Sequence, residues 1–259
     1  MRLRFACWIL HVTLQKPMTE VVQANPAVSE ETLKLLRLAS TATLHTQLFK
    51  RGIRKTFLSG VRPLNPASSF AGEAFTLRYI PAREDIDNLD VFDDPDNPQR
   101  KAIESVGPGQ VLIMDCRGDT EAASAGHILV TRLRERGAAA LVTDGALRDS
   151  TRIATEDFPA FAAGVSATLS LASHHAVDMQ MPISCAGVAV YPGDVVVGDG
   201  EGVIVIPRYL AAEVAHDAAE QEALEVFILD RIRDGAPLTG TYPPNDATVD
   251  AFRAGRVDA

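Results

Sequence analysis

The sequence predicts an α/β fold in which layered sheets are flanked by helices around a central βαβ unit. The strand PGQVLIMDC, the helix SAGHILVTRLRERG and the strand AAALVTDG follow one another directly. This order requires parallel strands and a right-handed crossover. The short β-branched runs ISCAGVAV, PGDVVVGD and EGVIVIP, separated by glycine turns, predict an antiparallel or mixed sheet. The 259 residues fit one large domain or two small ones, and we favour one.

Residues 1–28 are predicted to be an N-terminal extension. Their arginines and apolar run faintly imitate a secretory signal, but FACWIL is too short, is followed by His11 and lacks an A-x-A cleavage pattern. Met18 offers an alternative start. No window approaches 18 apolar residues, so we expect no contact with a membrane.

The remaining elements follow in order from residue 29. Ser29 is a plausible N-cap for one amphipathic helix, or two, ending at Gly52. The alternating stretch at residues 73–82 suits a strand. The acidic, proline-containing residues 83–99 predict an exposed loop, which could serve as a lid.

The C-terminal part begins with DFPAFAAG, a short strand candidate. The glycines in VVVGDGEGVIVIP lead into a strand and not a helix, so a phosphate loop is disfavoured, and Asp194 and Asp199 are predicted to shape turns. A long helix from Arg208 to Gly235 closes a domain of residues 29–235, and residues 236–259 form a proline-rich tail.

The composition limits the partners. A formal net charge of −9 argues against nucleic acid, and an anion site in such a protein needs an arginine, a helix N-terminus or a divalent cation. The three cysteines show no CxxC spacing and suggest a cytoplasmic protein, with Cys116 and Cys185 as small buried apolar residues. His174 and His175 are adjacent and would diverge on a helix, and they show no zinc-site spacing.

Gly126 opens the helix of the βαβ unit. The first amides, near His127, Ile128 and Leu129, have no partner within the helix, and together with the helix dipole they suit a carboxylate. The alternative is that Ser124 or a water caps this helix.

Arg148 and Asp149 follow the second strand of the unit, at the edge where α/β proteins usually bind ligands. Asp149 could hold a hard divalent cation, and Arg148 could stabilise oxygen charge that develops during a reaction. The alternative is a surface salt bridge. Because Gly126 belongs to the same edge, we expect one cavity, in which a 2-oxo acid places its carboxylate on the helix and its keto oxygen on the metal.

The runs PGQVLIMD, AGHILVTRLRERGAAALVTDGALRDS and ISCAGVAVYPGDVVVGDGEGVIVIP resemble the RraA-like family, which includes 4-hydroxy-4-methyl-2-oxoglutarate aldolases and regulators of ribonuclease activity. The similarity extends from about Leu33 to Gly235 and looks like the longer branch of the family. The resemblance implies a swivelling β/β/α fold, a homotrimer or homohexamer, and a class II aldolase mechanism with Mg²⁺ or Mn²⁺. It implies that Asp149 binds the metal, that Arg148 stabilises the enolate and that the amides after His127 hold the carboxylate.

Two positions depart from the family pattern. Arg152 stands where an acid commonly follows the aspartate by three residues, and His127 stands where an acid often follows the glycine. His127 could act as the base or be an ordinary helix-end histidine. Three hypotheses therefore remain: a metal-dependent lyase that cleaves a 4-hydroxy-2-oxo acid to pyruvate or decarboxylates oxaloacetate, a sugar-acid dehydratase using the same enolate, and a non-catalytic regulator of ribonuclease activity.

Overall fold

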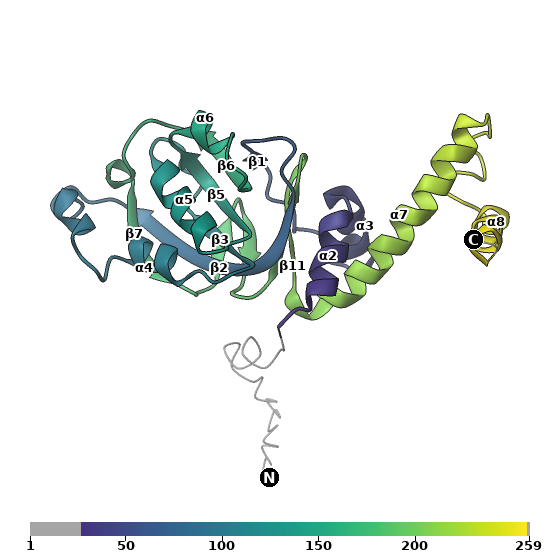
Figure 1. Cartoon of the computed structure of the whole chain (residues 1–259), viewed down its shortest axis with the longest axis horizontal. Coiled ribbons are helices and arrows are strands. Elements are labelled where there is room, and N and C mark those ends of the chain that lie inside the picture. The colour runs from purple at the N-terminus through teal and green to yellow at the C-terminus, as the bar shows by residue number, and fades with distance from the viewer. Residues whose placement is uncertain (1–26, 258–259) are drawn as a thin grey trace, which may run out of the picture.

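The computed structural model describes residues 27–257 (Figure 1). Two residues named or implied above lie outside the described range: Cys7, which is the third cysteine, and Met18, the alternative start. The helices are α2 (Glu30–Leu38), α3 (Thr41–Lys50), η1 (Leu89–Phe92), α4 (Pro98–Ser105), α5 (His127–Glu135), α6 (Ser150–Ile153), η2 (Ser170–Ala172), η3 (Arg208–Leu210), α7 (Ala211–Arg233) and α8 (Asp246–Val257). The strands are β1 (Arg62–Pro63), β2 (Phe70–Pro81), β3 (Gln110–Asp115), β4 (Ala123–Ala125), β5 (Ala140–Leu147), β6 (Ala160–Val165), β7 (His174–Met179), β8 (Ile183–Cys185), β9 (Val188–Val190), β10 (Val195–Asp199) and β11 (Gly202–Ile206).

The central βαβ unit is confirmed. β3 and β5 are parallel neighbours, with Val111 opposite Ala140, and α5 lies between them in the chain. All eight residues of β5 are buried, which explains why its sequence is a nearly continuous apolar run without alternation. The carboxyl end of β5 is therefore fixed in the sheet, close to the start of α5.

The large sheet has nine strands and is mixed, as predicted. Its main order is β1-β6-β5-β3-β2-β10-β11, and β4 and β7 pair with β5 and β2 respectively. The long strand β2 joins the two kinds of pairing, because it is parallel to β3 and antiparallel to β10 and β7. β6 extends the parallel part beside β5.

The layers have the β/β/α order that the resemblance implied. The β8–β9 hairpin packs on one face of the large sheet, where Ile183 and Val188 join a core with Val111. On the opposite face Val130 and Leu133 of α5 pack against residues of β2, β3 and β5. A third core joins α2, α3 and α7 to β10 and β11 (Figure 1).

The N-terminal helical region forms two helices. Ser29 caps α2 by accepting from the Thr32 amide, and Ser40 caps α3 by accepting from the Thr43 amide. A serine that caps a new helix favours extended backbone at its own position, so the first helix ends just before it. The Asp199 carboxylate, 2.8 Å from the Thr41 amide, ties α3 to the end of β10.

The structure corrects one local prediction and adds detail to two others. ISCAGVAV is not one strand, because Ala186 and Gly187 have φ of 48° and 74° and form the hairpin turn between β8 and β9. His174 and His175 diverge, as expected, but they do so on strand β7, where they face opposite sides and His174 is buried. The proline-rich tail contains helix α8, although its first part is irregular.

Cys116 and Cys185 are free and buried, as predicted. Burial raises the pKa of the Cys116 thiol to about 12 and also raises the pKa of Cys185, so both stay protonated at neutral pH. Within residues 27–257, no helix has the length and apolar character needed to cross a bilayer.

Candidate active site at the N-terminus of α5

Helix α5 begins at a glycine that cannot cap it. Gly126 occupies the N-cap position in extended conformation and has no side chain to accept a hydrogen bond, and the His127 amide donates to the Asp149 carboxylate. Ser124 does not cap the helix, because its buried hydroxyl lies 3.1 Å from Thr143 Oγ1 and donates to the Ala146 carbonyl at 3.0 Å. Among the described residues, the amides of Ile128 and Leu129 have no acceptor. These amides are therefore available to an anion.

Arg148 and Asp149 follow β5 directly and press against the start of α5. The Arg148 amide donates to the Ala125 carbonyl at 3.0 Å, and Asp149 adopts the left-handed conformation with φ 58°, which aspartate tolerates better than most residues. The Asp149 carboxylate faces α5, with Oδ2 3.3 Å from the His127 amide and 3.7 Å from Arg148 Nε. The two side chains are 43% and 41% exposed, so they do not form a dry internal ion pair.

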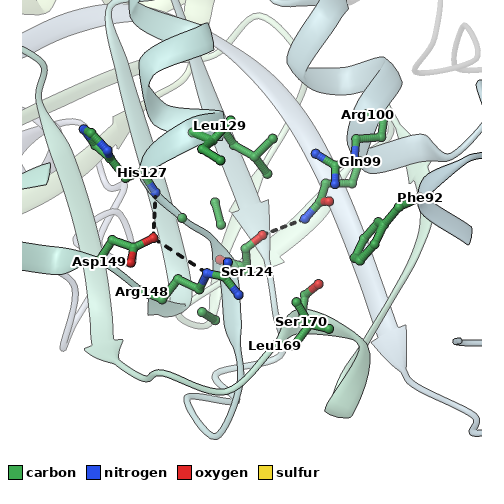
Figure 2. A pocket seen from close by; sticks show the side chains of 14 residues that line it. Phe92, Gln99, Arg100, Ser124, His127, Leu129, Arg148, Asp149, Leu169 and Ser170 are labelled. Carbon is green, nitrogen blue, oxygen red and sulfur yellow. Dashed lines mark hydrogen bonds and ion pairs between the residues drawn. The ribbon is translucent and has the colours of Figure 1, made fainter. Parts of the chain in front are cut away.

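The two elements converge on one cavity, as the βαβ geometry predicted. The cavity has a volume of about 310 Å³ and is lined by Gly126, His127, Ile128 and Leu129 together with Arg148 and Asp149 (Figure 2). Its size lies at the lower end of the range for small-molecule sites. The prediction that these groups share a hollow is confirmed, whereas their chemical roles stay predictions.

The opposite wall was missed by the sequence reasoning. It is formed by Phe92 of η1, by Gln99 and Arg100 of α4, and by Leu169 and Ser170. Gln99 is buried and donates to the Ser124 carbonyl at 2.7 Å and to Tyr79 Oη at 3.2 Å, so it fastens α4 to the floor of the cavity. The Asn-Pro pair at residues 97–98 is a helix-start signal that could have placed Gln99 and Arg100 in the first turn of a helix.

The side chain of His127 is held outside this cavity wall. Its Nε2 lies 2.8 Å from Glu156 Oε1, and the other Glu156 oxygen pairs with Arg134. The hydrogen bond to His127, together with Arg134, lowers the pKa of the Glu156 carboxyl. In Figure 2 the imidazole points away from Arg148, so the ring does not face the cavity, and the His127 amide donates to the Asp149 carboxylate.

Asp149 is the one carboxylate among the residues that line the cavity. Residues 27–257 contain no cluster of three or more His, Cys, Asp or Glu side chains that could hold a metal. Arg152, at the position where the family commonly has an acid, is exposed on α6. One accessible carboxylate still fits Mg²⁺, which usually keeps several waters and binds through one or two carboxylates plus substrate oxygens.

The fold and the cavity define an α/β protein with a cavity at the carboxyl edge of its parallel strands, where proteins of this class usually bind ligands. The model of the RraA-like family, described as Aldolase/RraA, matches residues 41–205. The chain belongs to this family.

The similar proteins include one named as a putative aldolase and one described as a member of an RNase inhibitor family. A putative 4-hydroxy-4-methyl-2-oxoglutarate aldolase of Halalkalibacterium halodurans is 34% identical over 178 residues, which are 67% of this chain and 79% of the relative. Streptomyces coelicolor RraAS2, described as an unusual member of the RNase ES inhibitor RraA protein family, has 29% identity and a TM-score of 0.70 over 78% of this chain and 98% of its own. An uncharacterized protein of Pseudomonas syringae has 26% identity and a TM-score of 0.73, covering 84% of this chain and all of its own.

Proposed function

We propose that this chain is a divalent-metal-dependent lyase that cleaves a 4-hydroxy-2-oxo acid to pyruvate by a retro-aldol reaction. One observation supports this most directly: the uncapped start of α5, the Arg148 guanidinium and the Asp149 carboxylate line the same cavity. Two relatives that are 34% and 32% identical to this chain are named as putative 4-hydroxy-4-methyl-2-oxoglutarate aldolases, which agrees with the proposal.

Each group has a role in this proposal. The amides of Ile128 and Leu129 would hold the substrate carboxylate, and Asp149 would hold Mg²⁺ or Mn²⁺. A cation bound there would supply Lewis-acid polarisation of the 2-oxo carbonyl. Arg148 donates to the same oxygen as negative charge develops on it. These groups favour the enolate over the ground state.

The bond changes are those of a retro-aldol cleavage. A base removes the proton of the 4-hydroxyl, the oxygen forms a carbonyl with C4, and the electron pair of the C3–C4 bond passes to the enolate of pyruvate. Protonation at C3 then completes pyruvate. His127 is the candidate base. Its ring is hydrogen-bonded to Glu156 and does not face the cavity, so we expect it to accept this proton through a water. Decarboxylation of oxaloacetate would form the same enolate.

Pyruvate release with Mg²⁺ tests the proposal. Asp149→Ala and Arg148→Ala should each lower kcat/KM by about a hundredfold or more, since each removes a group that acts on the developing charge. The matched controls are Asp230→Ala and Arg233→Ala, because Asp230 and Arg233 also form an exposed ion pair, at 2.8 Å on α7. An absence of pyruvate from the whole panel of 4-hydroxy-2-oxo acids and oxaloacetate would exclude the lyase.

The two other functions remain measurable alternatives. A sugar-acid panel that yields a 2-oxo product by loss of water would indicate the dehydratase. The likeness to RraAS2 favours a ribonuclease regulator as the second candidate. Such a regulator should bind a ribonuclease equally well with and without Arg148→Ala, because docking does not use the cavity.

We also propose that the chain assembles into a homotrimer or homohexamer. Helix α7 leaves the body of the molecule (Figure 1), and Val226 and Leu229 on it are 58% and 49% exposed. Apolar side chains on a projecting helix suit contact with another subunit. Light scattering after size-exclusion chromatography distinguishes a monomer from three or six copies.

A further inference from the structure

The wall of the cavity opposite α5 carries a second arginine. Arg100 lies in the first turn of α4, where Asn97 caps the helix by accepting from the Arg100 amide at 3.2 Å and Pro98 starts it. Arg100 and Phe92 both line the cavity that contains Arg148. The helix cap and the anchored neighbour Gln99 therefore fix the backbone from which Arg100 reaches this wall.

The guanidinium of Arg100 is stacked but not neutralised. Its Cζ lies 4.8 Å from the centroid of the Phe92 ring. No described residue forms an ion pair with it, whereas the adjacent Lys101 pairs with Asp96 at 2.5 Å. Stacking uses the face of a guanidinium and leaves its in-plane N–H groups free to donate, which suits a carboxylate.

The charges of the lining indicate the kind of ligand. Two arginines, Arg100 and Arg148, meet a single carboxylate, that of Asp149, in a protein with a formal net charge of −9. A cation held by Asp149 would make the cavity still more positive. The uncapped amides and Arg148 serve one end of a ligand, so Arg100 is left to serve the other end.

We propose that Arg100 is a specificity-determining residue that binds the distal carboxylate of a dicarboxylic 2-oxo acid. This inference rests on the proposed lyase function and adds to it the residue that selects a diacid, the class to which the 4-hydroxy-4-methyl-2-oxoglutarate in the relatives' names belongs. A monocarboxylic substrate would leave the Arg100 guanidinium without a partner in a partly desolvated wall. The diacid is therefore preferred over the monoacid.

Kinetics with two matched substrates test this selection. In 4-hydroxy-2-oxopentanoate, a methyl group replaces the distal carboxylate of 4-hydroxy-2-oxoglutarate. Arg100→Gln should lower kcat/KM for the diacid by about tenfold to a hundredfold, the effect of losing a charge-assisted hydrogen bond, and change it for the monoacid by less than about twofold. Arg100→Lys should keep part of the preference, because it keeps the charge but loses the planar fork.

The control is Lys101→Gln, which removes the neighbouring cation from the same helix. This variant should leave kcat/KM unchanged for both substrates. Circular dichroism and Tm of Arg100→Gln establish that the variant is folded. Equal losses on both substrates, or no loss on either, would overturn the assignment of Arg100.

Calorimetry with Mg²⁺ separates the inference from the function on which it rests. Oxalate is too short to reach the second wall, whereas 2-oxoglutarate carries a distal carboxylate. Arg100→Gln should weaken 2-oxoglutarate binding by about tenfold or more and leave oxalate binding unchanged. If Arg100→Gln binds each ligand as tightly as the wild type does, the selection by Arg100 is refuted while the lyase stands. If the wild type binds neither ligand, both proposals fail.

Discussion

Replacement of Gly126 by alanine probes the contact between α5 and the Arg148–Asp149 pair. An added Cβ would lie 2.9 Å from Arg148 Cγ and 3.0 Å from both Arg148 Nε and Asp149 Oδ2. Normal contact distances are about 3.5–4.0 Å, so these side chains must move by about 0.5–1 Å. The φ of −132° is open to alanine, and the backbone itself should not be strained.

The displacement should affect catalysis more than folding. Because Arg148 and Asp149 are partly exposed and can yield, we expect the free energy of unfolding to fall by only about 1 kcal/mol, including the poorer N-cap. A misplacement of this size costs up to about a hundredfold in rate, or about 2.7 kcal/mol of transition-state stabilisation. Pyruvate release and chemical denaturation measure the two effects separately.

The matched control is Gly255→Ala in α8, where an added Cβ meets nothing within 4 Å. It should leave kcat/KM unchanged. The reasoning would be refuted if Gly126→Ala kept wild-type kcat/KM and the same dependence on Mg²⁺, because the site would then tolerate displacement of both side chains.

Three further predictions concern stability. Burial lowers the pKa of His174, so the unfolded chain binds a proton at this imidazole more tightly than the folded chain does, and stability should fall as the pH drops below about 6.5. The decrease in Tm between pH 7.5 and pH 5.5 should be smaller in His174→Gln than in the wild type, and equal decreases would contradict this. Asp144 is buried and accepts from the amides of Cys116, Gly118 and Ala186, so Asp144→Asn should lower the free energy of unfolding by about 1–3 kcal/mol in urea, with Asp230→Asn as an unchanged exposed control. Leu44 of α3 is fully buried in the third core, so Leu44→Ala should lower the free energy of unfolding by about 2–5 kcal/mol. A loss below about 1 kcal/mol would show that this core is not closely packed.

The parts of the fold that were predicted correctly depend on nearby residues. The βαβ unit follows from three consecutive runs whose periodicities differ, and the positions of Gly126 and Arg148 at one edge follow from parallel pairing alone. The cap at Ser29 likewise needs only the next three residues. Local signals of this kind fix where an element begins and ends and on which edge its ends lie.

The features that the sequence did not predict, or predicted wrongly, are those that tertiary contacts decide. The Ala186-Gly187 turn is held by the Asp144 carboxylate, which accepts from the Ala186 amide across 42 positions of sequence. His174 lies in a strand because β7 pairs with β2, and its Nε2 is within 3.0 Å of the Ala122 carbonyl. The helix that carries Arg100 is anchored beside the cavity by the hydrogen bond from Gln99 to the Ser124 carbonyl, 25 positions away, which no periodic pattern predicts.

The two walls of the cavity come from separate segments of the chain. The wall with the uncapped amides, Arg148 and Asp149 comes entirely from residues 123–149, whereas Phe92 and Arg100 come from a segment that precedes β3. Substitutions in that earlier segment can therefore change which molecules are accepted without disturbing the groups that we propose act on the reacting carbonyl. Directed evolution of residues 83–100, with Gln99 kept because it holds α4 to the Ser124 carbonyl, should alter substrate preference and leave the proposed reaction unchanged.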